Sequence, residues 1–406
     1  MNVNIKKTLG ILALALALPA SANASGIVVG DESLIKLLQE KGIINKAEVK
    51  DLKKHDTSKF LKIGGRLQTQ FKSVIDGKTP RTNEFLVRRA RLTFKAQVTP
   101  WGFLKVQTEF GKNAVGLKDA YIGITPESLD GFEMDIGNQY VQFSREAMNS
   151  SKYLHFVERS TTSQFAPFRQ MGLNVSQKMF DNKLVAYAGL FNGSLNEGQI
   201  NPTRLGKNQI YHINTAGFKG AAQPTGLMYS GRIEYSPFGK FKKTQGDFDG
   251  ESQAQVGINY YGQTLGSSVS ALTSGLNSNS AIGVDAAYRG YGASIEAEWI
   301  ARTLAFNATN AATGARDVKQ KAYSIQGGYM VLPKLELAAR YENIDFDDKN
   351  VYTGSKGQSR AKEITFGANY YIKKHHMKIQ ANYVKKNLTG TTNKDDQVLI
   401  TSNYYF

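Results

Sequence analysis

The stretch RLTFKAQV, residues 91–98, alternates strictly between two kinds of side chain. Its even-numbered residues are Leu, Phe, Ala and Val, and its odd-numbered residues are Arg, Thr, Lys and Gln. A period of two predicts a β-strand with one apolar and one polar face. The same alternation recurs in QAQVGINY (253–260) and after Lys362. Because a soluble β-sandwich alternates as well, the period alone does not decide what the apolar face contacts.

The connections between the strands favour a membrane barrel. Seven short connections alternate with eight long polar ones, the pattern of an outer-membrane barrel with turns on one rim and loops on the other. They predict an all-β fold, a 16-stranded antiparallel transmembrane β-barrel. An alternative with 18 strands splits 205–226 into a further hairpin. The short connections lie near 99–100, 125–130, 180–182, 237–251 (longer than its rim predicts), 289–290, 332–333 and 373–374, and the long ones at 76–82, 112–116, 141–167, 192–226, 264–280, 303–318, 346–361 and 387–396.

The two ends of the chain agree with a membrane barrel in the outer membrane. Residues 1–24 combine a basic start, an apolar stretch and the small-residue site Ala22-Asn23-Ala24, which predicts a secretory signal peptide. Residues 25–58 have leucines at helical spacing and predict a short periplasmic helical segment. Residues 59–406 form the predicted barrel domain, and the chain closes on TSNYYF, an alternating strand with a terminal aromatic residue. We therefore expect the protein to be located in the bacterial outer membrane.

Charge and composition exclude several function classes. The formal charge of +17 indicates anionic partners, but an exported chain does not meet nucleic acid. The absence of cysteine excludes disulfides, thiolate metal sites and a thiol nucleophile. A barrel lipase or protease would need a histidine beside a serine or carboxylate. We expect His155 to be structural and the pair His375-His376 to be exposed in a tight turn. No enzyme activity and no cofactor are predicted, and the acidic loop residues Asp345, Asp347, Asp348, Asp247 and Asp249 lack a complete calcium loop and are expected to be solvated or bridged to lipopolysaccharide.

The stretch RRARLTF, residues 88–94, carries the functional prediction. Strict alternation from residue 83 to residue 98 directs Arg89, Arg91 and Lys95 to the lumen and Arg88 to the lipid face, near a rim or an interface. Basic rings in a lumen are the expected device of an anion pore. Arginine suits phosphate-like ions because its fork donates two parallel hydrogen bonds. The predicted anion-binding, pore-lining set is Arg66, Arg89, Arg91, Lys95, Lys105, Arg145, Lys152, Arg159 and Arg232.

Several motifs, in order, resemble the phosphate-selective porin O and P family. They are GGRLQ (64–68), RRARLTF (88–94), LKDAYIGI (117–124), SSKYLHFVERS (150–160) with FAPFRQMG (165–172), YAGLFNG (187–193) and GRIEYSPFG (231–239). The resemblance implies a 16-stranded homotrimeric porin with inward-folded loops and a basic ladder, to which Arg66, Arg89 and Arg88 would belong. The chain departs from the family where Val141 and Gln142 replace a basic residue and where Glu234 follows Arg232.

Two alternatives stay open at this point. The arginines can pair with lumen carboxylates instead of facing a solute, although RRARLTF itself contains no acid. The pore can also pass small solutes in general, without phosphate selectivity. We further expect the long connection 141–167 to fold into the lumen, since it mixes aromatic and basic residues and is poor in glycine.

Overall fold

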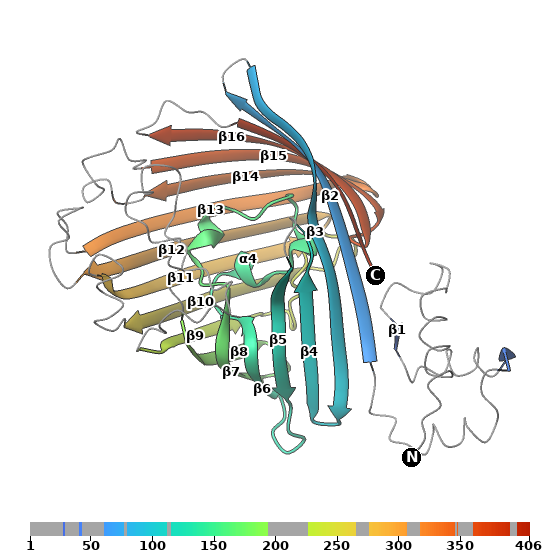
Figure 1. Ribbon diagram of the computed structural model, residues 1–406, viewed down its shortest axis with the longest axis vertical. Helices are drawn as coiled ribbons and strands as arrows, with labels where there is room; N and C mark the ends of the chain where they lie inside the picture. Colours follow the sequence, from blue (N-terminus) through green and yellow to red (C-terminus); the bar gives the residue numbers. More distant parts are fainter. Residues whose placement is uncertain are drawn as a thin grey trace.

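The computed structural model describes residues 27–28, 40–42, 61–76, 79–111, 115–193, 226–264, 276–306, 317–345, 347, 360–389 and 396–406. It shows a closed antiparallel barrel of 16 strands, β2 to β17, in which each strand pairs with its neighbours in sequence (Figure 1). The last strand pairs with the first, Tyr404 opposite Leu67, so no edge is left open. The predicted fold class is confirmed.

The strands have the following bounds: β2 Leu61–Asp76, β3 Thr79–Thr99, β4 Gly102–Glu109, β5 Gly116–Ile124, β6 Phe132–Tyr140, β7 Arg169–Met179, β8 Leu184–Phe191, β9 Met228–Tyr235, β10 Gln253–Thr264, β11 Leu276–Gly290, β12 Ala293–Phe306, β13 Asp317–Leu332, β14 Leu335–Asp345, β15 Arg360–Lys373, β16 Met377–Thr389 and β17 Asp396–Tyr405. The seven turns and eight loops alternate as predicted. The 18-strand alternative is wrong, because β8 pairs directly with β9 over its whole length. The first loop is shorter than expected, since β2 and β3 continue their pairing to Asp76 and Thr79.

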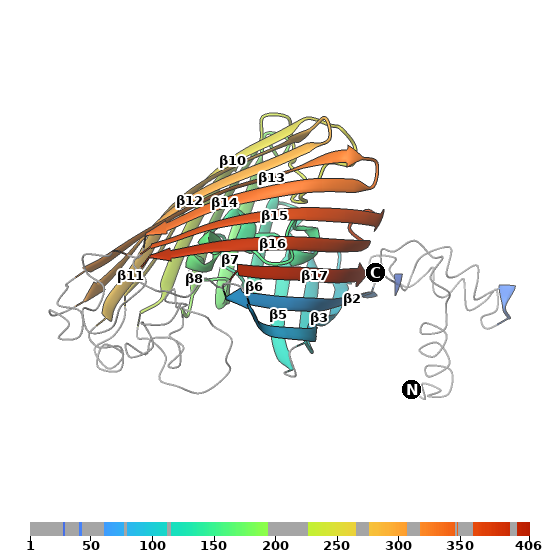
Figure 2. The ribbon, with the colours of Figure 1, turned by 90° about the horizontal axis from the view of Figure 1, so that it is seen from above.

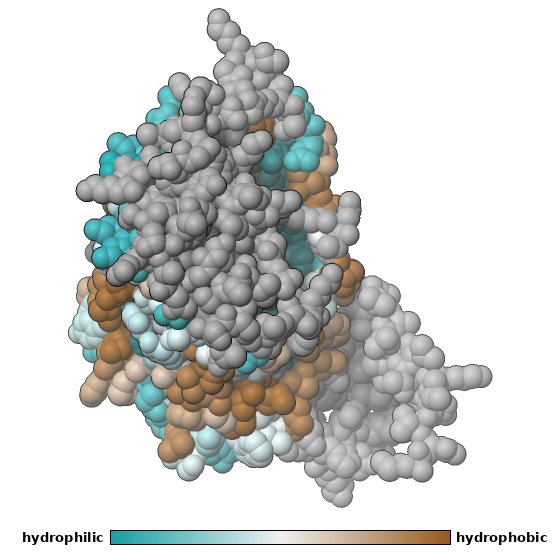
Figure 3. Space-filling view, turned by 60° about the vertical axis from the view of Figure 1, so that its left-hand side comes forward, coloured by the Kyte–Doolittle hydropathy of each residue, from teal (hydrophilic) through white to brown (hydrophobic). Residues whose placement is uncertain are grey.

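The outer wall is apolar, as the alternation predicted, and apolar side chains colour its surface in Figure 3. Exposed tyrosines lie near both rims of β9 to β17, for example Tyr260 and Tyr323 towards the loops and Tyr370 and Tyr404 towards the turns. Such aromatic girdles mark the two interfaces of a bilayer. Among the described residues, no helix combines the length and the apolar character needed to cross a membrane.

The terminal residue completes the sheet. Phe406 exchanges backbone hydrogen bonds with Gly65, of 3.2 and 3.1 Å. A Cβ at Gly65 would lie 2.4 Å from the ring of Phe406, so only glycine leaves room for the ring. The pattern GG at the start of the barrel therefore has a packing reason.

The connection between β6 and β7, residues 141–168, folds into the barrel and is called L3 below. It contains the short helix α4 (Arg145–Met148) and the 3-10 turns η1 (Ser151–Tyr153) and η2 (Thr162–Phe165), and it lies inside the ring of strands (Figures 1 and 2). Its apolar side packs in a buried cluster on inward residues of β8 to β15; the cluster contains Val141, Phe143, Ala147, Phe165, Ala166, Phe191, Met228, Tyr261, Ala281, Ile300, Ala322, Ile344 and Ala361. The predicted inward fold of this loop is confirmed.

The N-terminal predictions are largely outside the described residues. The signal peptide, 1–24, is not described, and of the segment 25–58 only a few residues are. Ile27–Val28 form the two-residue strand β1, which pairs antiparallel with Ile63 and Lys62 of β2.

Candidate functional site

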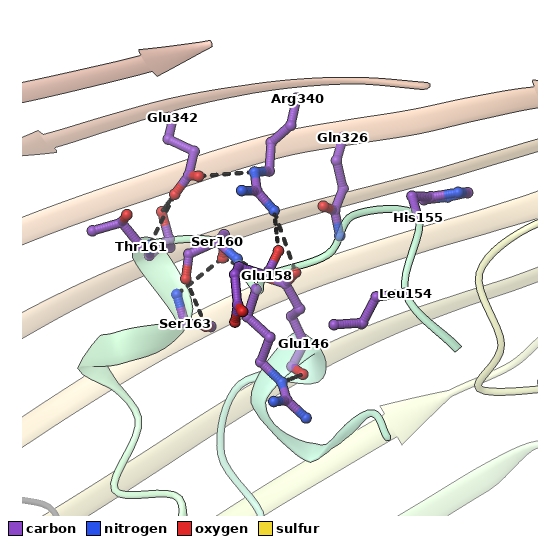
Figure 4. A network of polar contacts seen from close by, with 12 residues as sticks. Glu146, Leu154, His155, Glu158, Ser160, Thr161, Ser163, Gln326, Arg340 and Glu342 are labelled. Carbon is purple, nitrogen blue, oxygen red and sulfur yellow. Dashed lines mark hydrogen bonds and ion pairs between the residues drawn. The ribbon is translucent and has the colours of Figure 1, made fainter. Parts of the chain in front are cut away.

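L3 is fastened to one side of the barrel by charged and polar contacts. Ser144 and the backbone of Arg145 donate to the Glu298 carboxylate, each at 2.9 Å. Further along, the backbone of Thr162 donates to Glu342 at 3.1 Å. Figure 4 shows Arg340 between Glu342 and the backbone oxygen of Glu158, with distances of 2.8 and 3.1 Å. The loop is therefore held against the wall formed by β12 to β14.

A second inward segment supports L3 from the turn side. The connection between β9 and β10, residues 236–252, is called T4 and buries Gln245 completely. Gln245 donates its backbone N–H to Tyr153 at 3.0 Å and accepts from the backbone of His155 at 2.6 Å. His155 in turn lies 3.0 Å from Glu336, and both side chains are fully buried. The unexpected length of T4 is thus explained, and His155 is an anchor of L3.

Two cavities lie on the opposite side, against β2 to β7. The first, called the inner vestibule, has a volume of about 860 Å³ and reaches the turn rim at Lys62, His376 and Phe406. Eight lysines and arginines line it, against a single carboxylate, Asp119. The basic set is Lys62, Arg66, Arg91, Lys95, Lys105, Lys152, Arg169 and Lys373.

The second cavity, called the outer vestibule, lies towards the loop rim and has a volume of about 380 Å³. Its basic residues are Arg88, Arg89, Arg91, Lys118, Arg159 and Arg169, and its carboxylate is Glu109. Arg91, Tyr140 and Arg169 line both vestibules. The two cavities are therefore adjacent along this basic wall, and together they are called the conduit.

The sheet register places the cations of the conduit in rows. Lys62 lies opposite Lys95, and Lys95 opposite Lys105, across three adjacent strands. Towards the loops, Arg66 lies opposite Arg91. Like charges directly opposite each other destabilise a sheet, so these rows are not explained by stability.

Two β-bulges add cations that strict alternation does not supply. Between β2 and β3 the register steps from Gln68 opposite Arg89 to Thr69 opposite Val87, which leaves Arg88 as the extra residue. The prediction that Arg88 faces lipid is therefore wrong: the bulge turns it to the lumen beside Arg89. A second bulge leaves Lys118 extra between β4 and β5, and Lys118 also lines the outer vestibule.

Carboxylates compensate part of this positive charge. Arg91 contacts Glu109 at 2.6 Å, and Arg89 contacts Glu158 of L3 at 3.0 Å. The alternative in which the arginines pair with carboxylates is therefore correct for Arg89 and Arg91. Arg66 donates to the neutral groups of Asn403, Ser151 and Gln68, and it has no carboxylate partner within the described ranges.

The L3 carboxylate in this network stays ionised over the whole working range of pH. Burial alone would raise the pKa of Glu158, but Arg89 and Arg88 beside it outweigh burial and hold this pKa at about 2. Because the pKa of Glu158 is lowered, the ion pair of Glu158 with Arg88 and Arg89 is fully formed above the ordinary pKa of a glutamate. It is lost only as the pH falls towards 2.

Two members of the predicted set do not line the conduit. Arg145 is buried under Phe241 and contacts Asp285 at 2.9 Å. Arg232 is also buried and contacts Glu234 and the same Asp285, at 2.8 and 2.6 Å. Both arginines make their contacts on the side of the barrel that L3 fills, which is called the filled side. The expectation that they face a solute is therefore wrong. Arg66, Arg89, Arg91, Lys95, Lys105, Lys152 and Arg159 lie in the conduit wall.

The predicted set omits other conduit residues. Asp119 contacts Lys105 at 2.8 Å and also Arg169, whose guanidinium lies 3.8 Å from the centre of the Tyr140 ring. Lys118 and Asp119 are adjacent in LKDAYIGI, and no sequence pattern announces the bulge that turns both inward. Lys62 and Lys373 belong to strand ends, where the alternation is too short to assign a face.

The acidic residues of T4 are also reassigned. Asp247 and Asp249 both contact Arg289, so they fasten T4 to β11 and the proposed role at lipopolysaccharide is wrong for this pair. Within the described residues, no cluster of three or more His, Cys, Asp or Glu side chains could hold a metal ion.

Comparisons with known proteins agree with this geometry. The family model for phosphate-selective porin O and P matches residues 61–404. An uncharacterised protein of Aquifex aeolicus is 28% identical over 92% of this chain and 94% of its own length. Among solved structures, Salmonella typhi OmpF in complex with daunomycin has a TM-score of 0.58 at 16% identity, with 86% of this chain and 98% of that chain covered. The outer-membrane channel DcaP of Acinetobacter baumannii has a TM-score of 0.58 at 13% identity, with 87% and 99% covered. The trimer form of OmpT from Vibrio cholerae has a TM-score of 0.55 at 13% identity, with 86% and 100% covered.

Proposed function

The chain belongs to the phosphate-selective porin O and P family and is an outer-membrane porin, and we propose that its conduit passes small anions, phosphate among them, by passive diffusion. The observation that carries this proposal is the charge of the two vestibules. Twelve lysines and arginines line them together, against the carboxylates Asp119 and Glu109. A narrow path with walls of low dielectric constant focuses such a field and concentrates anions.

The arrangement of cations supports the passage of anions and not their tight binding at a single site. The cations follow one another along β2 and β3 from the turn rim to the bulge at Arg88, so an anion has several sites of similar kind. Conduction requires sites that bind strongly enough to admit an ion and weakly enough to release it. The residues that we expect to meet the solute are Lys62, Arg66, Arg91, Lys95, Lys105, Lys118, Lys152, Arg159 and Arg169.

The reversal potential of single channels tests this proposal. In a planar bilayer with a salt gradient, wild-type protein is expected to prefer chloride over potassium, because the conduit carries a net positive charge. Addition of phosphate is then expected to reduce the chloride current at concentrations well below that of chloride. A reversal potential at the cation side contradicts anion passage. Anion preference without any effect of phosphate favours the second candidate, a general small-anion porin.

A homotrimer is part of the same proposal, and the outer wall supports it. All the exposed tyrosines of the described barrel lie on β9 to β17 or their turns, and none lies on β2 to β8. The exposed large apolar residues on the strands β2 to β8 are instead aliphatic, Phe or Met, such as Leu104, Ile122 and Ile136, and the one exposed Trp of this described wall, Trp101, lies in the turn between β3 and β4. Lipid-facing strands need an interfacial girdle, whereas strands covered by another protomer do not. We therefore place the protomer contact on the wall of β2 to β8.

The absence of cysteine allows a direct test of this contact. Ile122→Cys on β5 is expected to be protected from a lipid-soluble maleimide, because a neighbouring protomer covers it. Ile258→Cys on β10 is the matched control, since it is similarly exposed on the wall with the girdle. We expect the unheated trimer to be labelled at position 258 and not at position 122. Heating in detergent, which gives monomers, is expected to expose both positions. Equal labelling of both cysteines in the trimer contradicts the assignment.

A further inference from the structure

The bulge in β3 creates a site that no other pair of neighbours in this strand offers. Consecutive residues of a regular strand point to opposite faces, but Arg88 and Arg89 both reach the lumen. The guanidinium groups of two adjacent residues can then bind the same oxyanion. The pair lies in the wall of the outer vestibule, beside Arg91.

A carboxylate of the protein itself occupies this pair. Glu158 accepts from Arg88 through both of its oxygens, with Nη2 at 2.7 Å from Oε2 and Nε in contact with Oε1. Arg89 donates to the same Oε2 at 3.0 Å. Two donors of one guanidinium on the two oxygens of one carboxylate make the strong side-on contact that arginine forms with oxyanions. The side chains of Glu158 and Arg88 keep 35% and 21% of their surfaces exposed, and Arg88 lines the outer vestibule, so the contact is not sealed from the lumen.

Glu158 is brought to the pair from the opposite side of the lumen. Its backbone oxygen accepts from Arg340 of β14 at 3.1 Å, while its side chain reaches β3. L3 thus carries one carboxylate across to the conduit wall. The other L3 carboxylate, Glu146, is buried against Ser160 and Arg340, and the structure gives it no contact with Arg88 or Arg89 within the described residues.

We propose that Glu158 is a specificity-determining residue: it fills the oxyanion site of Arg88 and Arg89 and so prevents permeating phosphate from being trapped there. The inference rests on the proposed anion passage. An empty pair of this geometry would hold phosphate by several charge-assisted hydrogen bonds, and a site that binds strongly releases its ion slowly. The tethered carboxylate competes for the same donors and neutralises one of the two positive charges of the pair.

Glu158→Gln tests the inference, because it removes the charge and keeps the size of the side chain. Single-channel chloride current is recorded while inorganic phosphate is added, and the concentration of half-block is compared with wild type. We expect the half-block concentration to fall about tenfold, because the freed guanidinium groups can then form charge-assisted hydrogen bonds to phosphate. The reversal potential is expected to move further to the anion side.

Glu146→Gln is the matched control, since it makes the same change in the same loop away from the conduit. If Glu158 only fastens L3, both variants raise the conductance and neither changes the half-block concentration, and the inference is overturned. Should Glu158→Gln not assemble, Glu158→Asp is measured instead. It keeps the charge but is too short to reach both arginines, so its half-block concentration of phosphate is expected below that of wild type. A half-block concentration equal to that of wild type for Glu158→Asp contradicts the inference.

The experiment separates this inference from the proposed function. If wild-type protein shows no anion preference, the proposed function fails, whatever the variants do. The charge of Arg88 and Arg89 is still exposed by Glu158→Gln, so a shift of its reversal potential relative to wild type supports the inference even then. An unchanged reversal potential together with an unchanged half-block rejects the inference alone.

Discussion

Replacing Lys62, Lys95 and Lys152 together by glutamate is expected to turn the channel from anion preference to cation preference. These three lysines line the inner vestibule and form no direct ion pair with a carboxylate in the part of the chain that the structure describes, although Glu133 and Asp135 act on Lys95 through space. Lys95 and Lys152 lie over the rings of Phe103 and Tyr405 instead, at 4.1 and 4.2 Å. Their charge is therefore available to a passing ion.

The size of the effect follows from Coulomb's law. One unit charge at roughly 8 Å in water contributes about 0.5 kcal/mol, so a change of six units amounts to about 3 kcal/mol before screening. Screening over a Debye length of roughly 8 Å reduces this, and about a tenfold change in the permeability ratio remains. The measurement is the reversal potential in a salt gradient, and its sign is expected to change.

A matched control separates local charge from total charge. Lys183→Glu, Lys240→Glu and Lys334→Glu make the same change on exposed turns of the same rim, outside both vestibules. This triple variant is expected to keep anion preference. If both triple variants shift the reversal potential equally, the selectivity comes from the charge of the whole rim and not from the conduit.

The fold could be predicted because its signal is repeated. Alternation and the two classes of connection recur around the barrel, and the pairing of each strand with its sequence neighbour leaves few other topologies. The inward fold of L3 was also predictable from its aromatic residues. A further signal was present at Ile300, Ile344 and Ala361, which occupy lumen positions where a water-filled barrel would have polar side chains.

The site was harder to predict, because it depends on single-residue shifts and on contacts between distant segments. One bulge reverses the face of Arg88, and periodicity cannot reveal a bulge. The partner of Arg88 and Arg89, Glu158, comes from a loop about 70 residues further on, so a reading of RRARLTF alone finds no acid. Arg145 and Arg232 share Asp285 by the same kind of long-range contact. Sequence patterns identified the cations and the wall, and the tertiary contacts decided which cations face the solute.

Deleting Asn149 to Thr162 of L3 is expected to raise the single-channel conductance about twofold or more. A 16-stranded barrel without an inward segment encloses an open aqueous channel, and L3 fills much of that space here. The deletion removes η1 and Glu158, which separate the conduit from the filled side. Several residues of the wall and of T4 lose their L3 partners, but in a widened lumen they face water, so the cost of losing these partners is small. They are Arg66, Arg88, Arg89, Gln245, Glu336, Arg340 and Glu342.

The barrel is expected to tolerate this deletion because of what remains. Helix α4 and turn η2 contact each other, so the new ends lie close together and can be joined without strain. Val141, Phe143 and Phe165 remain and still cover the apolar lumen residues Ile300 and Ile344. The shortened protein should therefore keep its heat-modifiable trimer, which is the assembly control. It should also lose part of its anion preference, since charges on a wider wall act on an ion over a longer and better screened distance. Unchanged conductance in a correctly assembled trimer would show that the narrowest part of the pore lies outside L3.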